Sequence, residues 1–344
     1  MRISDSMYLS NFGKTLASDQ FREVLGDGAS LEALNVSCSA LMKLYGGLGG
    51  STECSIANSL WTDPEGRMQE DFVGRCSGIF DAQVFQEDLS APVIVPALNS
   101  WVSDHTAGMI PQIIQRPFGE DAAALMVNAL YLKNTWAAKF DPSDTITRDF
   151  TRADGTAEPL DFLQHFSRSL TYLQSGSDEG VLLPYDDGRL AFFALMPRQS
   201  SGVPDFERWL SSLTGEGLSA LLSGRDETFF LRLSLPKFEQ EWSGELKDAL
   251  AALGLTDAFD PDLADFSLLG DDPRGYYLSQ VIHAARIEVN EEGTEAAAAT
   301  VVAAASGAAP PQEGVTLIFD RPFLYGIVDL QNGVPLFLGT FEGL

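Results

Sequence analysis

Basic residues and histidine are scarce in this chain of 344 residues. It has 22 Lys and Arg against 49 Asp and Glu, a formal net charge of -27, and only three histidines. So large a negative charge opposes any sequence-independent attraction to nucleic acid or anionic lipid. No apolar run approaches the roughly eighteen residues of a membrane span. The composition therefore predicts a solvated acidic surface, with neither nucleic acid nor membrane as a partner.

Cysteine is also rare, since the chain has only Cys38, Cys54 and Cys76. An odd number without CxxC spacing argues against a disulfide framework and against a thiolate metal site. We therefore predict buried free thiols and no metal. The first residues, Met1 to Ser6, have no apolar stretch after Arg2 and are not typical of a signal peptide.

The motifs that mark common enzymes are missing. None of the histidines lies in an HExxH pattern, and there is no GxSxG elbow and no complete EF-hand loop. The glycine cluster at 46–50 lacks the lysine and preceding strand of a phosphate-binding loop, so an ordinary loop is favoured. His105 is expected on a helix, His165 has no predicted role, and His283 lies in a predicted strand. The chain is therefore predicted to be neither an enzyme nor dependent on a cofactor.

A stretch near the end of the chain is more informative. A β-rich run from Ser279 to Val289 is followed by nineteen residues, Gly293 to Pro311, that contain nine alanines and one charge, Glu295. Composition alone indicates a solvated linker. However, small or β-branched residues recur at every second position, which is the side-chain period of a strand. These are Thr294, Ala296, Ala298, Thr300 and Val302. The segment is therefore predicted to be able to become a strand.

Patterns elsewhere predict the main elements. The nearly continuous apolar run 122–132 is typical of a strand covered on both faces. A helix is expected over 99–108, and another from Ser243 to a stop at Gly254. Apolar runs at 323–330 and 334–341 flank Asn332-Gly333, the strongest short hairpin signal. Chains of this length often form two domains. No linker divides this chain, however, so a single domain is predicted.

Several motifs together carry a family resemblance. Asn128-Ala129-Leu130-Tyr131-Leu132-Lys133-Asn134-Thr135-Trp136 is similar to the serpin strand Asn-Ala-Ile-Tyr-Phe-Lys-Gly-x-Trp. Leu235-Pro236-Lys237-Phe238, Leu253 to Phe259 and Phe319 to Leu324 follow in the family's order. The chain thus resembles the serpins, protease inhibitors whose exposed loop inserts into their own sheet.

The resemblance covers roughly residues 21–341 and implies an α+β fold. The expected architecture is one serpin-type domain over 1–344. Several helices would surround a large, mostly antiparallel central sheet and two smaller sheets, with an exposed reactive-centre loop at 291–311. The segment 11–25 is similar to the end of the family's second helix and the start of its third. The first helix, the start of the second and a Ser-Pro-x-Ser stretch would then lack counterparts, so Asn128 and His283 are expected to lose hydrogen-bond partners. Either the given start is not the native one, or trapping activity has been lost.

The function implied is suicide inhibition of a serine protease through a covalent acyl complex. The hinge would comprise Gly293, Thr294, Glu295, Ala296, Ala297, Ala298, Ala299 and Thr300. Family spacing from Glu291 puts the reactive bond at Ser306, Gly307 and Ala308. No Arg or Lys lies between Thr294 and Pro311, so an elastase-like or subtilisin-like target is expected rather than a trypsin-like one. The alternative is a non-inhibitory serpin-fold protein for binding, storage or chaperoning.

The resemblance also implies contacts and partners. His283 would pair with Asn128 where the sheet parts, and Glu291 would pair with Lys237 beside Trp136 at the loop base. No heparin is expected, because the stretch that matches the family's heparin helix, 31–47, carries only Lys43. A monomer is expected. The family favours an extracellular location, whereas the missing signal peptide leaves a cytoplasmic one open.

Overall fold

The computed structural model describes residues 20, 22–24, 28–167, 170–198, 206–226, 230–272, 275–294 and 314–344. The predicted second helix and most of the predicted loop therefore lie outside the described residues. The chain divides into two compact units. The first comprises residues 1–48, 53–132 and 240–286, and the second comprises 49–52, 133–239 and 287–344.

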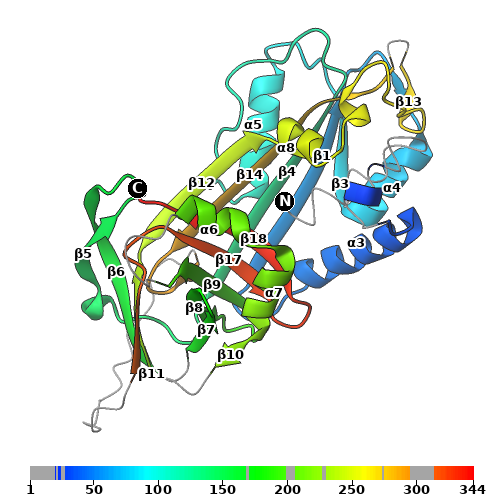
Figure 1. Cartoon of the computed structure of the whole chain (residues 1–344). Helices are drawn as coiled ribbons and strands as arrows, with labels where there is room; N and C mark the ends of the chain where they lie inside the picture. Colours follow the sequence, from blue (N-terminus) through cyan, green and yellow to red (C-terminus); the bar gives the residue numbers. More distant parts are fainter. Residues whose placement is uncertain are drawn as a thin grey trace. The chain divides into compact units, whose positions relative to one another are not determined.

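The first unit is built on a sheet whose strands follow the order β12–β14–β4–β1–β3 (Figure 1). Its strands are β1 (Glu53–Thr62), β2 (Arg67–Met68), β3 (Ala82–Gln86), β4 (Ala124–Thr135), β12 (Phe238–Glu245), β13 (Gly270–Asp271) and β14 (Leu278–Val289). Its helices are α3 (Leu31–Gly46), α4 (Glu70–Phe80), α5 (Ile94–His105), α8 (Lys247–Ala252) and the 3-10 turn η2 (Asp257–Phe259). Strands β4, β12 and β14 continue past the unit boundary into the second unit.

The strand predicted to be covered on both faces is β4, and that prediction is confirmed. Ala124 and Met126 pack into a core with helices α4 and α8. Leu125 and Val127 face the opposite way, into a core that includes Trp101 of α5. Alternate side chains of one strand thus enter two separate cores, because the side-chain period of a strand is two. Every position from Ala124 to Leu132 is buried, so the alternation could not appear in the sequence as an alternation of polarity.

The helix predicted near residue 99 is α5, which begins earlier, at Ile94. The stop at Gly108 is confirmed, since this residue has φ +79° and its N–H donates to the carbonyl of Ser103 at 2.8 Å. The helix predicted from Ser243 is wrong in its start, because β12 continues to Glu245 and α8 begins only at Lys247. The Leu246 N–H donates to the Val281 carbonyl of β14 at 2.8 Å, and this bond holds the segment extended beside the sheet.

The second unit contains one sheet in the order β10–β7–β8–β9–β17–β18 and another in the order β16–β11–β6–β5. Its strands are β5 (Ile146–Thr151), β6 (Ala157–Ser167), β7 (Thr171–Ser175), β8 (Asp178–Pro184), β9 (Leu190–Pro197), β10 (Arg225–Asp226), β11 (Phe230–Pro236), β15 (Gly293–Thr294), β16 (Gly314–Ile318), β17 (Phe323–Asp329) and β18 (Val334–Phe341). Its helices are α6 (Phe206–Ser212), α7 (Gly215–Ser223) and the 3-10 turn η1 (Pro142–Asp144).

The predicted C-terminal hairpin is confirmed as β17 and β18, which pair antiparallel from Phe323 and Phe341 to Asp329 and Val334. Gly333 in the turn has φ +68°, which glycine adopts without steric cost. The carboxylate of Asp329 caps the turn by accepting the Gln331 N–H at 2.9 Å.

The prediction of buried free thiols is confirmed for Cys38 and Cys76 but not fully for Cys54. Cys38 and Cys76 are buried, Cys54 is half-buried, and all three are free thiols. Burial raises the pKa of each thiol to about 12, so all three are protonated at neutral pH. Of the helices that the structure describes, none is both long and apolar enough to cross a bilayer.

Candidate loop-insertion site

The two-residue strand β15 lies between the last residues of β4 and β14 in the second unit. Thr294 pairs with Asn134 of β4 on one side and with Val289 of β14 on the other, and both pairings are antiparallel. Gly293 pairs with Thr135. A Cβ atom on Gly293 would lie 2.0 Å from the carbonyl oxygen of Asn134, so a larger residue would force the two strands apart. The predicted hinge therefore begins already paired with the sheet.

The side chain of Thr294 is buried, with 1% of its surface exposed. Its hydroxyl is hydrogen-bonded to the hydroxyl of Tyr185. The Tyr185 ring stacks on Trp136, with ring centroids 4.9 Å apart and planes 5° from parallel. The indole N–H of Trp136 donates to the carbonyl of Asn290 at 2.8 Å. Trp136 thus braces both the hinge side chain and the backbone that leads to it.

Asn134 forms a polar cluster that sequence reasoning missed. Its side chain is completely buried, and its Nδ2 donates to Oδ2 of Asp187 at 2.7 Å. The Ser51 hydroxyl lies 3.1 Å from Asn134 Oδ1, donates to Asp186 Oδ1 at 2.7 Å and accepts the Thr135 N–H at 3.1 Å. The available signal was that Asn134 occupies the position of the glycine in the quoted serpin strand. The glycine-rich segment before Ser51 therefore serves as a loop that delivers a hydroxyl to the end of β4.

The loop base carries the predicted ion pair. Glu291 Oε2 lies 2.9 Å from Lys237 Nζ, and Glu291 Oε1 accepts the Thr145 hydroxyl at 3.0 Å. Partial burial would raise the pKa of Glu291. The hydrogen bonds from Lys237, from its own backbone N–H and from Thr145 outweigh that cost and hold its pKa below the usual range. The Lys237 side chain is 43% exposed, so the pair is a weakly stabilising, solvent-screened contact.

Backbone hydrogen bonds hold the same segment from the other side. The Trp136 N–H donates to the Glu292 carbonyl and the Phe140 N–H to the Glu291 carbonyl, each at 3.0 Å. Glu292 also forms an ion pair with Lys139, which the sequence did not predict. The chain before the hinge is therefore anchored by main-chain bonds as well as by charge.

The second predicted pairing lies in the first unit, in the middle of β4 and β14. His283 and Asn128 face each other in the parallel register, and His283 Nδ1 lies 2.9 Å from Asn128 Oδ1. Because that oxygen can only accept, the ring donates from Nδ1. Asn128 Nδ2 donates to Asn58 Oδ1 at 2.8 Å, and Asn58 Nδ2 donates to the carbonyl of Phe80 at 3.0 Å.

This chain of bonds corrects one expectation. Asn128 was predicted to lose partners, yet both ends of its amide are hydrogen-bonded. Asn58 of β1 supplies the partner, and sequence reasoning missed it because β1 and β4 are 70 residues apart at this point. All three side chains are buried, with 2–5% of their surfaces exposed.

The two remaining histidines pack against aromatic rings, and the remaining residues of the predicted loop lie outside the described part of the chain. His105 stacks on Trp101 within α5, as expected for a helix-packing residue. His165 packs edge-on against Phe140, and burial lowers its pKa. The hinge from Glu295 to Thr300 and the reactive-bond residues Ser306, Gly307 and Ala308 lie outside the described residues. Within the described ranges, no group of three His, Cys, Asp or Glu side chains is placed to hold a metal ion.

Comparison with known proteins identifies the family. Residues 5–343 match the family described as Serpin (serine protease inhibitor). The chain is 31% identical over 335 residues to serpin-Z2B of Triticum aestivum, covering 93% of this chain and 82% of that one. It is 33% identical over 316 residues to plasminogen activator inhibitor 1 of Neovison vison, covering 87% and 75%. It spans 61% of the length of two serpin B10 relatives, from Sorex araneus and Otolemur garnettii.

Solved structures agree with this assignment and with the predicted α+β fold. The thermophilic serpin tengpin in its native state superposes with a TM-score of 0.91 at 28% identity, covering 99% of this chain and 86% of tengpin. Thyroxine-binding globulin in complex with thyroxine shares the fold, with a TM-score of 0.86 at 21% identity over 99% of this chain and 90% of that one. The chain belongs to the serpin family.

Proposed function

We propose that this chain is a suicide-substrate inhibitor of serine proteases, which traps its target by inserting the cleaved loop into the sheet. One observation carries the proposal. Thr294 already pairs with Asn134 and with Val289. In an antiparallel pair, each step forward on one strand is a step backward on its partner. Five residues after Thr294, residue 299 would therefore face Ala129 of β4 and Ala284 of β14. Ala129 and Ala284 are paired with each other in the structure. A strand that continued from β15 would therefore be in register with both neighbours at once.

The faces of such a strand also match. Thr294 is buried, and residues at every second position after it would point to the same side. These are the alanines and threonine at 296, 298 and 300. On β4 the even-numbered side chains Ala124 and Met126 enter one of the two cores. Small residues at the inward positions of the loop could join that core without displacing it.

Direct pairing of β4 with β14 supports an arrangement that precedes insertion. The two strands pair in parallel between 124–130 and 278–285, so no strand separates them there. The TM-score to tengpin is 0.91 for its native state and 0.81 for its latent state, which covers 99% of this chain and 89% of that one at 26% identity. The described fold is thus closer to the native state.

The chemistry would proceed as follows. The catalytic serine of the protease attacks the carbonyl carbon of the reactive bond, the amine leaves, and an acyl-enzyme forms. Cleavage releases the amino-terminal part of the loop to insert before water hydrolyses the ester. About a dozen inserted residues, each gaining a hydrogen bond worth a net ~1 kcal/mol, supply on the order of 10 kcal/mol to distort the protease. This requires a starting fold that is kinetically rather than thermodynamically stable.

The bait sequence favours a target with a small or shallow specificity pocket. Ser306, Gly307 and Ala308 at the reactive bond follow a run of alanines, and the segment from Thr294 to Pro311 has no basic residue. A buried carboxylate in a trypsin-like pocket would find no partner there. Elastase-like and subtilisin-like proteases are therefore the proposed targets. The proposed inhibitor acts as a monomer, without heparin, a metal or another cofactor, and is not itself an enzyme.

Incubation with elastase or subtilisin followed by denaturing gel electrophoresis tests the proposal. An inhibitor gives a covalent band near the summed masses, and the same protease with its catalytic serine replaced by alanine gives none. Mass spectrometry of the released C-terminal fragment should place the cleavage between Ala303 and Ala309. If cleaved fragments alone appear with every protease, the non-inhibitory alternative of a binding, storage or chaperone protein is favoured instead.

A further inference from the structure

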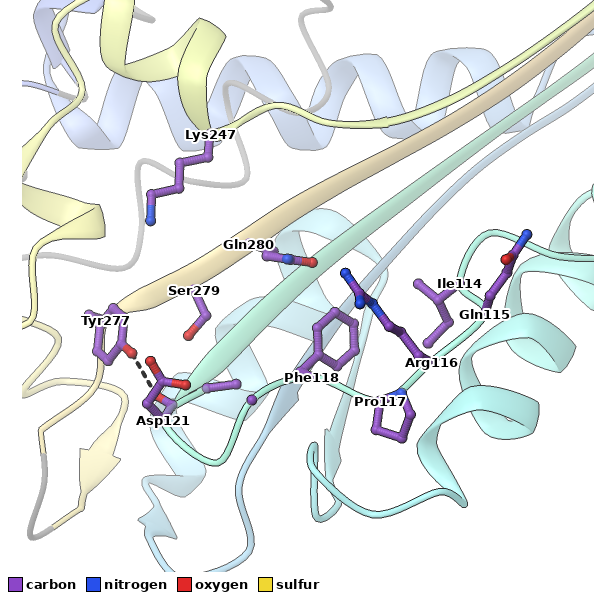
Figure 2. Close-up of a pocket in the computed structure, with 12 residues that line it drawn as sticks. Ile114, Gln115, Arg116, Pro117, Phe118, Asp121, Lys247, Tyr277, Ser279 and Gln280 are labelled. Atoms are coloured by element: carbon purple, nitrogen blue, oxygen red, sulfur yellow. Dashed lines mark hydrogen bonds between the residues drawn. The ribbon is translucent and has the colours of Figure 1, made fainter.

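A pocket of about 930 Å³ lies in the first unit, at the beginning of β4 and β14. Its volume is within the range of small-molecule sites. Figure 2 shows Tyr277, Ser279 and Gln280 of the β14 segment on one side, with Phe118 and Arg116 from the segment before β4 on the other. Lys247 of α8 projects into the same space. None of these side chains belongs to the loop base around Thr294 and Glu291.

A β-bulge shapes the floor of this pocket. Leu278 pairs with Ala124 of β4, but Gln280 pairs with Leu125, so Ser279 is an extra residue on β14. In a regular strand, Ser279 and Gln280 would face opposite sides. Both line the pocket, because a bulge redirects the side chains around it. Two neighbouring polar side chains are thus presented to one cavity.

The pocket is held open by hydrogen bonds that do not need a ligand. The Ser279 hydroxyl oxygen accepts the Ala123 N–H at 2.9 Å, and the Tyr277 hydroxyl donates to the Asp121 carbonyl at 2.6 Å. The Phe118 N–H donates to the Leu89 carbonyl at 3.0 Å. Since Ser279 accepts through its oxygen, its own O–H remains available to donate. The walls are therefore preformed, and one donor faces the cavity.

Two cations line this pocket in a chain with more than twice as many acids as bases. In the part of the chain that the structure describes, neither Arg116 nor Lys247 lies within ion-pair distance of a carboxylate. The ammonium of Lys247 lies over the ring of Phe259, 5.7 Å from its centroid. In Figure 2 the two charged heads flank Gln280 from different elements, while Asp121 lies at the Tyr277 end. The space around Gln280, between the two cations, thus favours an anion, and Asp121 disfavours a second negative charge beside Tyr277.

We propose that this pocket binds a small amphipathic organic monoanion, with a carboxylate or sulfonate held by Arg116 and Lys247. Gln280 and Ser279 donate hydrogen bonds to the same oxyanion, since an amide and a hydroxyl both have donors to offer. The flat apolar part of the ligand packs on Phe118, Ile114 and Pro117, which also line the cavity. The proposed ligand binds the uncleaved chain, because about a dozen residues inserted from Thr294 in the proposed register would reach Ser279 and Gln280.

Fluorescence titration of the intact protein with 8-anilinonaphthalene-1-sulfonate tests the site without any protease. The double variant Arg116→Ala/Lys247→Ala should raise the Kd at least tenfold. The control Lys43→Ala/Arg75→Ala removes two exposed cations from helices α3 and α4 and should leave the Kd unchanged. Circular dichroism checks that the variants are folded, and Arg116→Glu, at an exposed position, gives a second variant that should weaken binding further.

A neutral probe provides the opposite control. N-phenyl-1-naphthylamine lacks the sulfonate and should bind more weakly than the charged dye, with no difference between wild type and the double variant. Equal dye affinity in wild type and the Arg116→Ala/Lys247→Ala variant would overturn the proposal, and so would equal affinity of the two probes for the wild type. A protein that traps no protease but shows the expected Kd changes would refute the inhibitor function and leave this site standing.

Discussion

Two regions along β4 and β14 are held together by different kinds of interaction, buried hydrogen bonds in one and a partly exposed ion pair in the other. In the first unit, Asn128 and His283 form a buried chain of hydrogen bonds with Asn58. In the second unit, the loop base depends on an ion pair, Glu291 with Lys237, in which the lysine is 43% exposed. Water can replace the partners of the second group but not those of the first. Removing one partner should therefore lower the free energy of unfolding far more in the buried cluster than at the loop base.

This difference suggests separate roles for the two regions. The buried cluster stabilises the parallel pairing of β4 with β14, which the proposed insertion would have to break. The exposed pair contributes little free energy but lies two residues before the predicted hinge, so we expect it to influence when the proposed insertion begins. A region that sets stability and a region that sets timing should respond differently to substitution.

The largest effect is expected from Asn128→Ala. The change removes the Asn128 partner of the buried Asn58 side-chain oxygen Oδ1 and of the buried His283 Nδ1–H, at ~1–3 kcal/mol each. The free energy of unfolding should fall by about 2–6 kcal/mol on that basis, measured by urea unfolding with circular dichroism. The control Asn332→Ala removes an exposed amide that donates to Asp329 Oδ2 in the β17–β18 turn, and it should cost only about 1 kcal/mol because water can replace that bond. Equal losses in both variants would contradict the comparison.

The next effect concerns insertion itself and uses two adjacent alanines. Ala298→Arg places a charge on the face shared with Thr294, whereas Ala297→Arg places it on the opposite face. The ratio of covalent complex to cleaved, released inhibitor should fall at least tenfold for Ala298→Arg, which corresponds to about 1.4 kcal/mol between the two outcomes. The same ratio should fall much less for Ala297→Arg. Gel densitometry of complex and cleaved product gives the ratio. Equal ratios for the two variants would mean that the loop does not insert in the register extended from Thr294.

A smaller effect is expected at the loop base. Glu291→Lys puts two ammonium groups together where a pair worth up to about 1 kcal/mol existed. The loop base should loosen, and polymers should form on mild heating, measured by size-exclusion chromatography. The double variant Glu291→Lys/Lys237→Glu restores opposite charges and should return to a monomer. If Glu291→Lys remains monomeric under the same heating, the pair does not control opening.

The smallest effect is the pH dependence of that pair. The pKa of Glu291 is lowered in the folded protein, so the stability it contributes is present at neutral pH and is lost as pH falls through the folded pKa. The difference in thermal midpoint between wild type and Glu291→Gln should be small at pH 7, should begin to shrink near the ordinary glutamate pKa of 4.5 and should vanish once the pH is below the lower pKa of the folded protein. A difference that grows on acidification would reverse the sign of the argument.

Short-range patterns predicted much of the fold. Asn332-Gly333 between two apolar runs identified the hairpin, and the apolar run of β4 identified a strand covered on both faces. These signals succeed because backbone period and turn geometry depend on neighbours within a few residues.

Contacts between segments that are distant in the chain could not be predicted from such short-range patterns. Helix α8 begins after Leu246 because that residue still bonds to Val281 of β14. Asn134 needs Asp187 and Ser51, which lie 53 and 83 residues away in the chain. The bulge at Ser279 depends on how β14 pairs with β4.

By itself, the sequence determined the period of each strand, the hairpin turn, the free thiols and the small residues of the loop. Only the tertiary structure decided that Asn58 completes the bond of Asn128, that Asn134 is clamped at the end of β4, and that Arg116 and Lys247 share one pocket. Period and turn are properties of a local stretch of chain, whereas a hydrogen-bond partner is selected by which distant segments the packing brings within about 3 Å.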